Sequence, residues 1–146
     1  MIAVDTNILV HAHRRDAAFH RRATVVVREL AESPAPWAIC FHNLIEFYGV
    51  ATHARLWSQP SSPHQALEQI AAWRESMSLR ILGDEATALT GLSELLVRAH
   101  IQGAKVHDAR IANCCLAHGV RLLLSADRDF SSFPALKTKN PLVDAK

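Results

Sequence analysis

The chain opens with Met1-Ile2-Ala3-Val4-Asp5-Thr6-Asn7, and this stretch decides the fold. A short apolar run, Ile2 to Val4, stops at a carboxylate, and a helical pattern begins two small polar residues later. Such a run is typical of a buried strand, which places Asp5 at the carboxyl edge of a sheet. Ligands of open α/β folds bind at that edge. The other acids of interest are therefore those that the fold brings to the same edge.

Length and composition predict one domain spanning residues 1–146. The apolar fraction of 49% and the charged fraction of 21% are those of an ordinary soluble globule. No apolar run approaches the roughly 20 residues that cross a bilayer. The start of the chain lacks a basic region followed by a long apolar one, so no secretory signal is expected. We therefore expect a cytoplasmic protein.

Short apolar runs recur along the chain and alternate with helical patterns. We expect strands over residues 37–41, 78–82 and 121–125, with an edge strand in the tail at 134–143. The run Leu122-Leu123-Leu124 is wholly apolar, as in a central parallel strand. This alternation predicts a three-layer α/β/α domain with a central, mostly parallel sheet.

The helical segments carry start and stop signals. Ser62, Pro63 and Gln65 form a capping-box start, and Gly119 is a typical residue after a helix end. Other expected helices cover residues 8–13, 44–52 and 106–117. Two more are expected to start at Asp16 and at Gly83-Asp84. Apolar positions predicted to lie on helices include Phe19, Ala23, Val26, Val27, Leu30, Leu67, Ile70, Met77, Leu92, Leu95 and Leu96.

Four acids stand out by their surroundings. Asp5 ends the first strand and Asp127 follows the Leu122–Leu124 strand, so the two meet if these strands are parallel neighbours. Asp108 begins a helix and shares a face with the apolar residues three, four and seven positions later. Glu46 lies in a segment that is apolar almost all round, where an acid is costly unless a charged group meets it.

Each acid also has a purely structural interpretation. Asp5 and Asp108 are candidate helix N-caps, Asp127 a turn residue, and Glu46 a partner for one arginine. Four carboxylates at one edge, however, repel one another and raise one another's pKa values. A divalent cation resolves the repulsion, and oxygen-only ligands suit Mg²⁺, with Mn²⁺ as a substitute.

The remaining ionisable residues are less informative. Cys40, Cys114 and Cys115 lack the spacing of a zinc site and read as core residues in a reducing compartment. A net charge of +2 does not by itself indicate nucleic acid. The basic residues form either a solvated surface or a path for a phosphate backbone. They are Arg14, Arg15, Arg21, Arg22, Lys105, Arg110 and Arg128.

Several segments together resemble the PIN-domain ribonucleases, and most closely the VapC toxins of type II toxin–antitoxin pairs. The resemblance extends over essentially the whole chain. The segments are Val4-Asp5-Thr6-Asn7-Ile8-Leu9, Asn43-Leu44-Ile45-Glu46, His107-Asp108-Ala109 and Leu123 through Phe130, with its acids at Asp127 and Asp129.

The resemblance implies a Mg²⁺-dependent endoribonuclease that is a homodimer and is blocked by a cognate VapB-type antitoxin. Asp5 and Asp108 would be the main metal ligands, and Glu46 and Asp127 would complete the acidic cluster. Asn7 and Ser125 match the family's polar positions, and Asp129 its second acid, in a turn or supporting role. Three alternatives stay open: a non-catalytic RNA-binding or regulatory PIN-like domain, a receiver-like phosphoacceptor, and a flap- or exonuclease-type metal enzyme.

Overall fold

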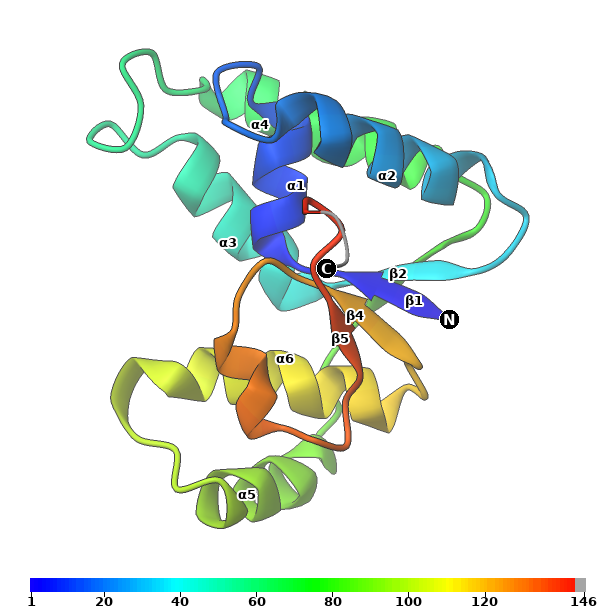
Figure 1. Cartoon of the computed structure of the whole chain (residues 1–146), viewed down its shortest axis with the longest axis vertical. Coiled ribbons are helices and arrows are strands. Elements are labelled where there is room, and N and C mark those ends of the chain that lie inside the picture. Colours follow the sequence, from blue (N-terminus) through cyan, green and yellow to red (C-terminus); the bar gives the residue numbers. More distant parts are fainter. Residues whose placement is uncertain (144–146) are drawn as a thin grey trace.

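The computed structural model describes residues 1–143, and five parallel strands form its central sheet. Their order is β3-β2-β1-β4-β5, so β1 lies in the middle (Figure 1). The strands are β1 (Ile2–Val4), β2 (Trp37–Cys40), β3 (Leu79–Leu82), β4 (Leu122–Leu124) and β5 (Thr138–Lys139). Every pairing among these strands is parallel, where the sequence predicts a mostly parallel sheet.

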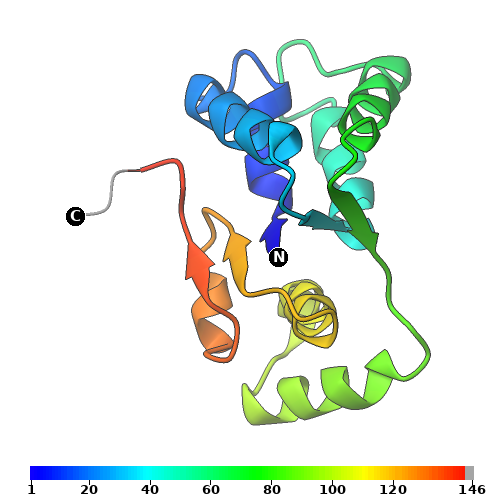
Figure 2. The ribbon, with the colours of Figure 1, turned by 90° about the vertical axis from the view of Figure 1, so that its right-hand side faces the viewer.

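Helices cover both faces of this sheet. The first four lie on one face and the last two on the other (Figures 1 and 2). They are α1 (Thr6–His13), α2 (His20–Glu32), α3 (Phe41–Ala51), α4 (Pro63–Arg74), α5 (Ala88–Arg98) and α6 (Val106–Ala117), with 3-10 turns η1 (Gly103–Lys105) and η2 (Asp129–Ser132). The prediction of a three-layer α/β/α arrangement is confirmed.

Each face of the sheet has its own buried core. Trp37, Phe47 and Trp73 belong to the core under α1 to α4. Phe130 and Leu123 belong to the core under α5 and α6. The second core also contains all three cysteines, in agreement with the expectation that they are core residues. None of the helices within residues 1–143 has the length and apolar character of a membrane span.

Several local signals have the outcome that the sequence predicts. Ser62 and Gln65 form both hydrogen bonds of a capping box at the start of α4. Gly119 follows α6 with a φ of +69°, a conformation that residues with a Cβ rarely adopt. The strand expected at an edge in the tail is β5, which pairs with β4 alone.

Two predicted helix starts are wrong, for the same physical reason. Asp16 does not cap α2, because Arg14 binds both of its carboxylate oxygens and the helix begins only at His20. Asp84 does not cap α5, because it pairs with Arg110 from α6. In both cases an arginine pairs with the carboxylate that the sequence predicts to cap a helix.

Some apolar residues predicted to lie in strands or on helices are exposed at the surface. Phe41, expected to end a strand, opens α3 and is 53% exposed. Met77 lies beyond the end of α4 and is 93% exposed, and Phe19 is 42% exposed. The helix expected from residue 8 begins two residues earlier, at Thr6, because Asp5 caps it.

Candidate active site

Asp5 lies where the central strand ends and the first helix begins. Its backbone N–H donates to the carbonyl of Leu124 at 2.9 Å, which extends the pairing of β1 with β4 by one residue. Its side chain accepts from the backbone N–H of Thr6 and caps α1. The structural interpretation of Asp5 as an N-cap is therefore correct, and it also places the carboxylate at the carboxyl edge of the sheet.

Four donors hold the Asp5 carboxylate, two on each oxygen. Oδ1 accepts from the backbone N–H of Thr6 at 2.8 Å and from Nδ2 of Asn43 at 2.9 Å. Oδ2 accepts from Nδ2 of Asn7 at 2.8 Å and from Oγ of Ser125 at 2.6 Å. The donors come from α1, α3 and the end of β4, so the carboxylate joins three elements at one point.

Burial dominates the electrostatics of Asp5. The residue is 4% exposed, and this desolvation raises the pKa of its carboxyl to about 6. The hydrogen bonds from Ser125 and Thr6 lower the pKa, and the charges of Glu46 and Asp108 raise it further. Both of these acids therefore lie close enough to act on Asp5, as the sequence predicts.

Asp127 and Asp129 lie in a hydrogen-bonded turn beyond β4. Ser125 Oγ accepts from the backbone N–H of Asp127 at 2.9 Å, and Asp127 Oδ1 accepts from the backbone N–H of Asp129 at 2.8 Å. Asn7 Oδ1 accepts from the N–H of Ala126 at 3.0 Å and so joins the turn to α1. Asp127 thus makes the turn that the sequence suggests, and both Asp127 and Asp129 are exposed residues.

Asp108 differs from the other acids because it has no structural task. It is the third residue of α6, whose N-cap position is Lys105, so its interpretation as an N-cap is wrong. Within residues 1–143 its carboxylate takes part in no hydrogen bond or ion pair. Partial burial raises its pKa first, and the charges of Asp127, Asp129 and Glu46 raise it further.

Glu46 reaches the site from the surface. It lies on the exposed side of α3, so the prediction of an acid inside an apolar helix is wrong. The helix leaves this side to solvent, since neighbouring Ile45 is 57% exposed. Thr6 Oγ1 donates a hydrogen bond to Glu46 Oε2, and this bond ties the carboxylate to the first turn of α1.

The carboxylates form a donor set that fits a hard divalent cation. Asp108, Asp127 and Asp129 each offer an oxygen, and these atoms lie within 4.8 Å of one another. Oxygen-only ligands at such separations suit Mg²⁺ or Mn²⁺. In the described part of the chain Asp5 and Glu46 are not members of this group. The charge of Glu46 nevertheless raises the pKa values of Asp5 and Asp108, and the charge of Asp108 raises the pKa of Asp5.

Asn43 is a site residue whose role the sequence does not reveal. It is fully buried, and its Nδ2 donates both to Asp5 and to Thr6 Oγ1 at 2.9 Å. Its Oδ1 is buried without a partner among the described residues. The one feature of the sequence that links Asn43 to the site is its position three residues before Glu46. This spacing makes the two residues neighbours on the surface of one helix.

Some of the basic residues proposed to contact a phosphate backbone pair with acids instead, namely Arg14, Lys105 and Arg110. Lys105 Nζ lies 3.8 Å from Asp129 Oδ1, beside the acidic group. Arg110 Nε pairs with Asp84. Arg14 is only 9% exposed and lies 4.4 Å from the ring centre of Trp57.

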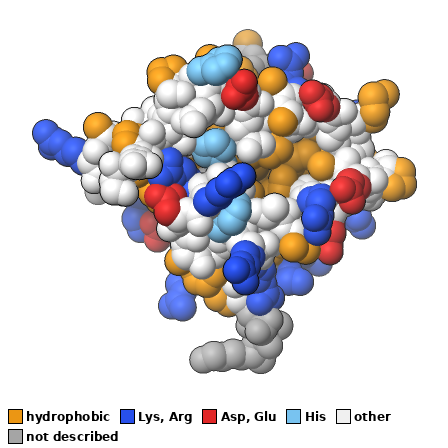
Figure 3. Space-filling view, turned by 90° about the horizontal axis from the view of Figure 1, so that it is seen from above, with side chains coloured by type: hydrophobic (Ala, Val, Ile, Leu, Met, Phe, Trp, Pro, Cys, Tyr) orange, Lys and Arg blue, Asp and Glu red, His pale blue; other side chains and the backbone are white. Residues whose placement is uncertain are grey.

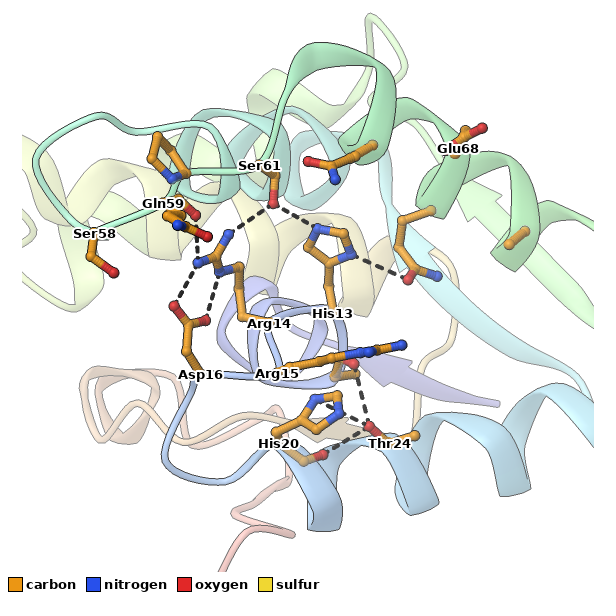
Figure 4. Close-up of a pocket in the computed structure, with 15 residues that line it drawn as sticks. His13, Arg14, Arg15, Asp16, His20, Thr24, Ser58, Gln59, Ser61 and Glu68 are labelled. Carbon is orange, nitrogen blue, oxygen red and sulfur yellow. Dashed lines mark hydrogen bonds and ion pairs between the residues drawn. The ribbon is translucent and has the colours of Figure 1, made fainter.

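Arg14 holds the far end of α1, away from the acids. It bonds Asp16, Ser61 Oγ and the carbonyl of Gln59 (Figure 4). Asp5 and Arg14 flank the two ends of an eight-residue helix, which spans about 12 Å. Arg14 is thus a structural residue, and its interpretation as part of a nucleic-acid path is wrong.

The far end of α1 opens into a groove of about 1060 Å³ between α2 and α4. Histidine and other basic side chains gather on this face of the molecule (Figure 3), and those that line the groove are histidines and arginines. Arg15 and His20 both line the groove (Figure 4). Its polar lining contains no member of the acidic group described above.

The parallel sheet and the acids at its carboxyl edge define a PIN domain, and a model of the PIN domain family matches residues 2–136. The chain belongs to this family. The resemblance seen in the sequence is thereby confirmed.

Within the PIN family, the chain is similar in sequence to proteins named as VapC ribonucleases. Ribonuclease VapC43 of Mycobacterium tuberculosis is 29% identical over 142 residues, which cover 97% of this chain and 96% of VapC43. Ribonuclease VapC48 of the same organism is 26% identical over 137 residues, 94% of each chain.

Solved structures support the fold. M. tuberculosis VapC20, described as a sarcin-ricin loop cleaving toxin, superposes with a TM-score of 0.67 at 23% identity, covering 90% of this chain and 94% of VapC20. VapBC2 from Rickettsia felis, solved with a DNA fragment from its promoter, gives a TM-score of 0.69 at 23% identity, with coverage of 96% and 98%.

Proposed function

We propose that this protein is a Mg²⁺-dependent endoribonuclease and the toxin of a type II toxin–antitoxin pair. One observation carries the proposal: Asp108 is a partly buried carboxylate without a partner in residues 1–143, and three other acids raise its pKa. Folding gains nothing from such a residue, but a cation would neutralise it. Relatives covering nearly the whole chain are named VapC ribonucleases, which supports this activity.

In this proposal Asp5 and Asp108 are metal ligands, as the family resemblance implies. Asp127 and Glu46 complete the catalytic acids. Asp129 is an addition, because it shares the group of close carboxylates with Asp108 and Asp127. When bound, the metal supplies a water of lowered pKa and neutralises charge on the scissile phosphate.

The chain's own residues orient the site and limit its electrostatic cost. Asn7, Asn43, Ser125 and Thr6 fix Asp5 from both oxygens, so its position is set before a ligand arrives. Ser125 also holds the backbone of Asp127 and thereby couples two of the proposed catalytic acids.

Cleavage of RNA tests the proposed activity directly. Purified protein is incubated with RNA in Mg²⁺, in Mn²⁺ and in EDTA, beside Asp5→Asn and Asp108→Asn. Glu94→Gln is a matched control, since Glu94 is an exposed acid on α5. We expect cleavage only with metal, and only in wild type and the control. Wild-type rates in either aspartate variant, or in EDTA, would show that the site is misassigned.

Metal binding can be measured separately from activity. A cation at about 100 times its Kd stabilises the folded state by about 2.7 kcal/mol, which raises the Tm of a chain of this size by about 5–11 °C. Asp127→Asn should abolish most of this rise and yet stabilise the metal-free protein, because it removes a like charge beside Asp108. RNA binding without metal-dependent cleavage would favour the regulatory alternative.

The partners follow from the same proposal. Several solved PIN-fold neighbours are described as toxin–antitoxin complexes, and we propose a cognate VapB-type antitoxin, a homodimer and a place in the cytoplasm for this chain. Light scattering of the purified protein tests the dimer. Growth arrest on expression, relieved by the product of an adjacent small gene, tests the antitoxin.

A further inference from the structure

Two stacked histidine rings lie beside the acids and have no task in the function proposed above. His42 stands in the first turn of α3, one turn before Glu46. His107 stands in the first turn of α6, immediately before Asp108. The ring centroids are 5.4 Å apart and the planes differ by 11°. The two helices that supply acids to the site therefore also supply a stacked aromatic pair.

Arg110 fixes the inner ring of this pair. Its Nη1 lies 3.0 Å from His42 Nδ1, and its Nε is held by Asp84. A guanidinium group only donates hydrogen bonds, so Nδ1 of His42 must accept and the proton of the neutral ring is on Nε2. The orientation of His42 is thus set from two sides, by Arg110 at its edge and by His107 on its face.

The outer ring is available to a ligand. His42 is half-buried, whereas His107 is exposed. A planar group that packs against the solvent side of His107 would extend a stack whose inner member already contacts Arg110. Asp108 is the next residue in the same first turn of α6, so a base packed on His107 would lie near a phosphate bound at the acids.

We propose that His107 is a base-stacking residue, on which one unpaired nucleobase of the RNA packs beside the cleaved phosphate. The inference rests on the proposed ribonuclease function and adds one contact to it, between the exposed ring of His107 and the free face of one base. Aromatic side chains stack on any base, because every base has a π face, whereas a base inside a duplex offers no free face. His42 and Arg110 are positioning residues in this scheme, since they hold the stack from behind.

Binding of RNA in EDTA tests the inference without any cleavage. The probe is a single-stranded 12-mer in which 2-aminopurine replaces each base in turn, since stacking quenches the fluorescence of this analogue. We expect quenching at one or two adjacent positions with wild type. His107→Ala should remove the quenching and weaken binding about tenfold, within the range found for stacked bases. His107→Phe should keep both, because the ring is retained.

Controls separate stacking from other causes. His64→Ala changes an exposed histidine on α4 and should behave as wild type. Wild type should bind a fully paired duplex of the same sequence more weakly than the single strand. The duplex should bind wild type and His107→Ala with equal affinity. The inference is overturned if wild type gives no quenching, if His107→Ala binds as tightly as wild type, or if His107→Phe binds as weakly as His107→Ala.

The outcome is distinguishable from that of the proposed function. Ring-dependent quenching without metal-dependent cleavage would retain the stacking residue and reject the nuclease. Cleavage with the same KM in wild type and His107→Ala would retain the nuclease and reject the stacking residue.

Discussion

Ser125→Ala removes the hydroxyl that joins three parts of the site. Ser125 Oγ donates to Asp5 Oδ2 at 2.6 Å and accepts from Asn7 Nδ2 at 3.1 Å and from the N–H of Asp127 at 2.9 Å. Ser125 is 3% exposed and Asp5 4% exposed, so water does not readily replace the lost hydroxyl. The substitution therefore leaves a buried carboxylate with one donor fewer.

The size of the effect follows from the charge on Asp5. A hydrogen bond to a charged group contributes about 1.5–3 kcal/mol, and one between neutral groups about 0.5–1.5 kcal/mol. Around neutral pH we therefore expect Ser125→Ala to lower the free energy of unfolding by about 1.5–3 kcal/mol. For a domain of this size that corresponds to a fall in Tm of about 3–12 °C.

The loss should depend on pH, with a sign fixed by the pKa of Asp5. Burial raises this pKa from 3.8 to about 6 in the folded protein. The folded state therefore binds more protons than the unfolded state between these values, and the contribution of Asp5 to stability falls as the pH rises through this window. Below about pH 6 the Asp5 carboxyl is mostly protonated in the folded state, and the bond with Ser125 is then one between neutral groups. The loss caused by Ser125→Ala should accordingly be larger at pH 7.5 than at pH 4.5.

Urea unfolding followed by circular dichroism, in EDTA at both pH values, measures these differences. Ser131→Ala is the matched control, because Ser131 is exposed in η2. It should be within about 0.5 kcal/mol of wild type at both pH values. An equal loss at pH 4.5 and 7.5, or a variant as stable as wild type, would refute the reasoning about a charge-assisted bond.

Further substitutions test other parts of the structure. Arg14→Met should lower the free energy of unfolding by about 2–3 kcal/mol, because its charged hydrogen bonds are lost, yet leave RNA cleavage by the folded protein intact. Arg15 is exposed, so Arg15→Ala should leave stability nearly unchanged. Urea unfolding and cleavage rates check both variants. Gly91→Ala should destabilise by about 1–3 kcal/mol, since its Cβ would lie 2.6 Å from Asn113 Oδ1. An added Cβ at Gly49 would meet nothing within 4 Å among the described residues beyond its own helix backbone and chain neighbours. Gly49→Ala should therefore stabilise by about 0.5–1 kcal/mol, and thermal unfolding distinguishes the two signs.

The fold was predictable where a local pattern determines it. Strand β4 is wholly apolar and the start of α4 has a capping box, and both follow from neighbouring residues alone. The wrong helix starts concern Asp16 and Asp84, whose carboxylates are bound by arginines. Arg110 is 26 residues from Asp84, so a local window contains no sign of this competition.

The site was predictable from topology but not from burial. Parallel neighbours β1 and β4 bring Asp5 and Asp127 to one edge whatever the details of packing. The exposure of Glu46 depends on how α3 is rotated against the sheet, and the role of Asn43 depends on a contact 38 residues away. Neither is encoded in the spacing of residues along the chain.

The acids divide into a preorganised carboxylate and an uncompensated one. Asp5 has four donors, yet burial still raises its pKa to about 6, so the hydrogen bonds offset only part of the desolvation. Asp108 has no donor among the described residues and is destabilised by three neighbouring charges. A cation would lower both pKa values, and the gain is largest for the residue that folding leaves unpaired. The acidic edge therefore lowers the stability of the metal-free protein. Metal binding should restore more of this stability through Asp108 than through Asp5.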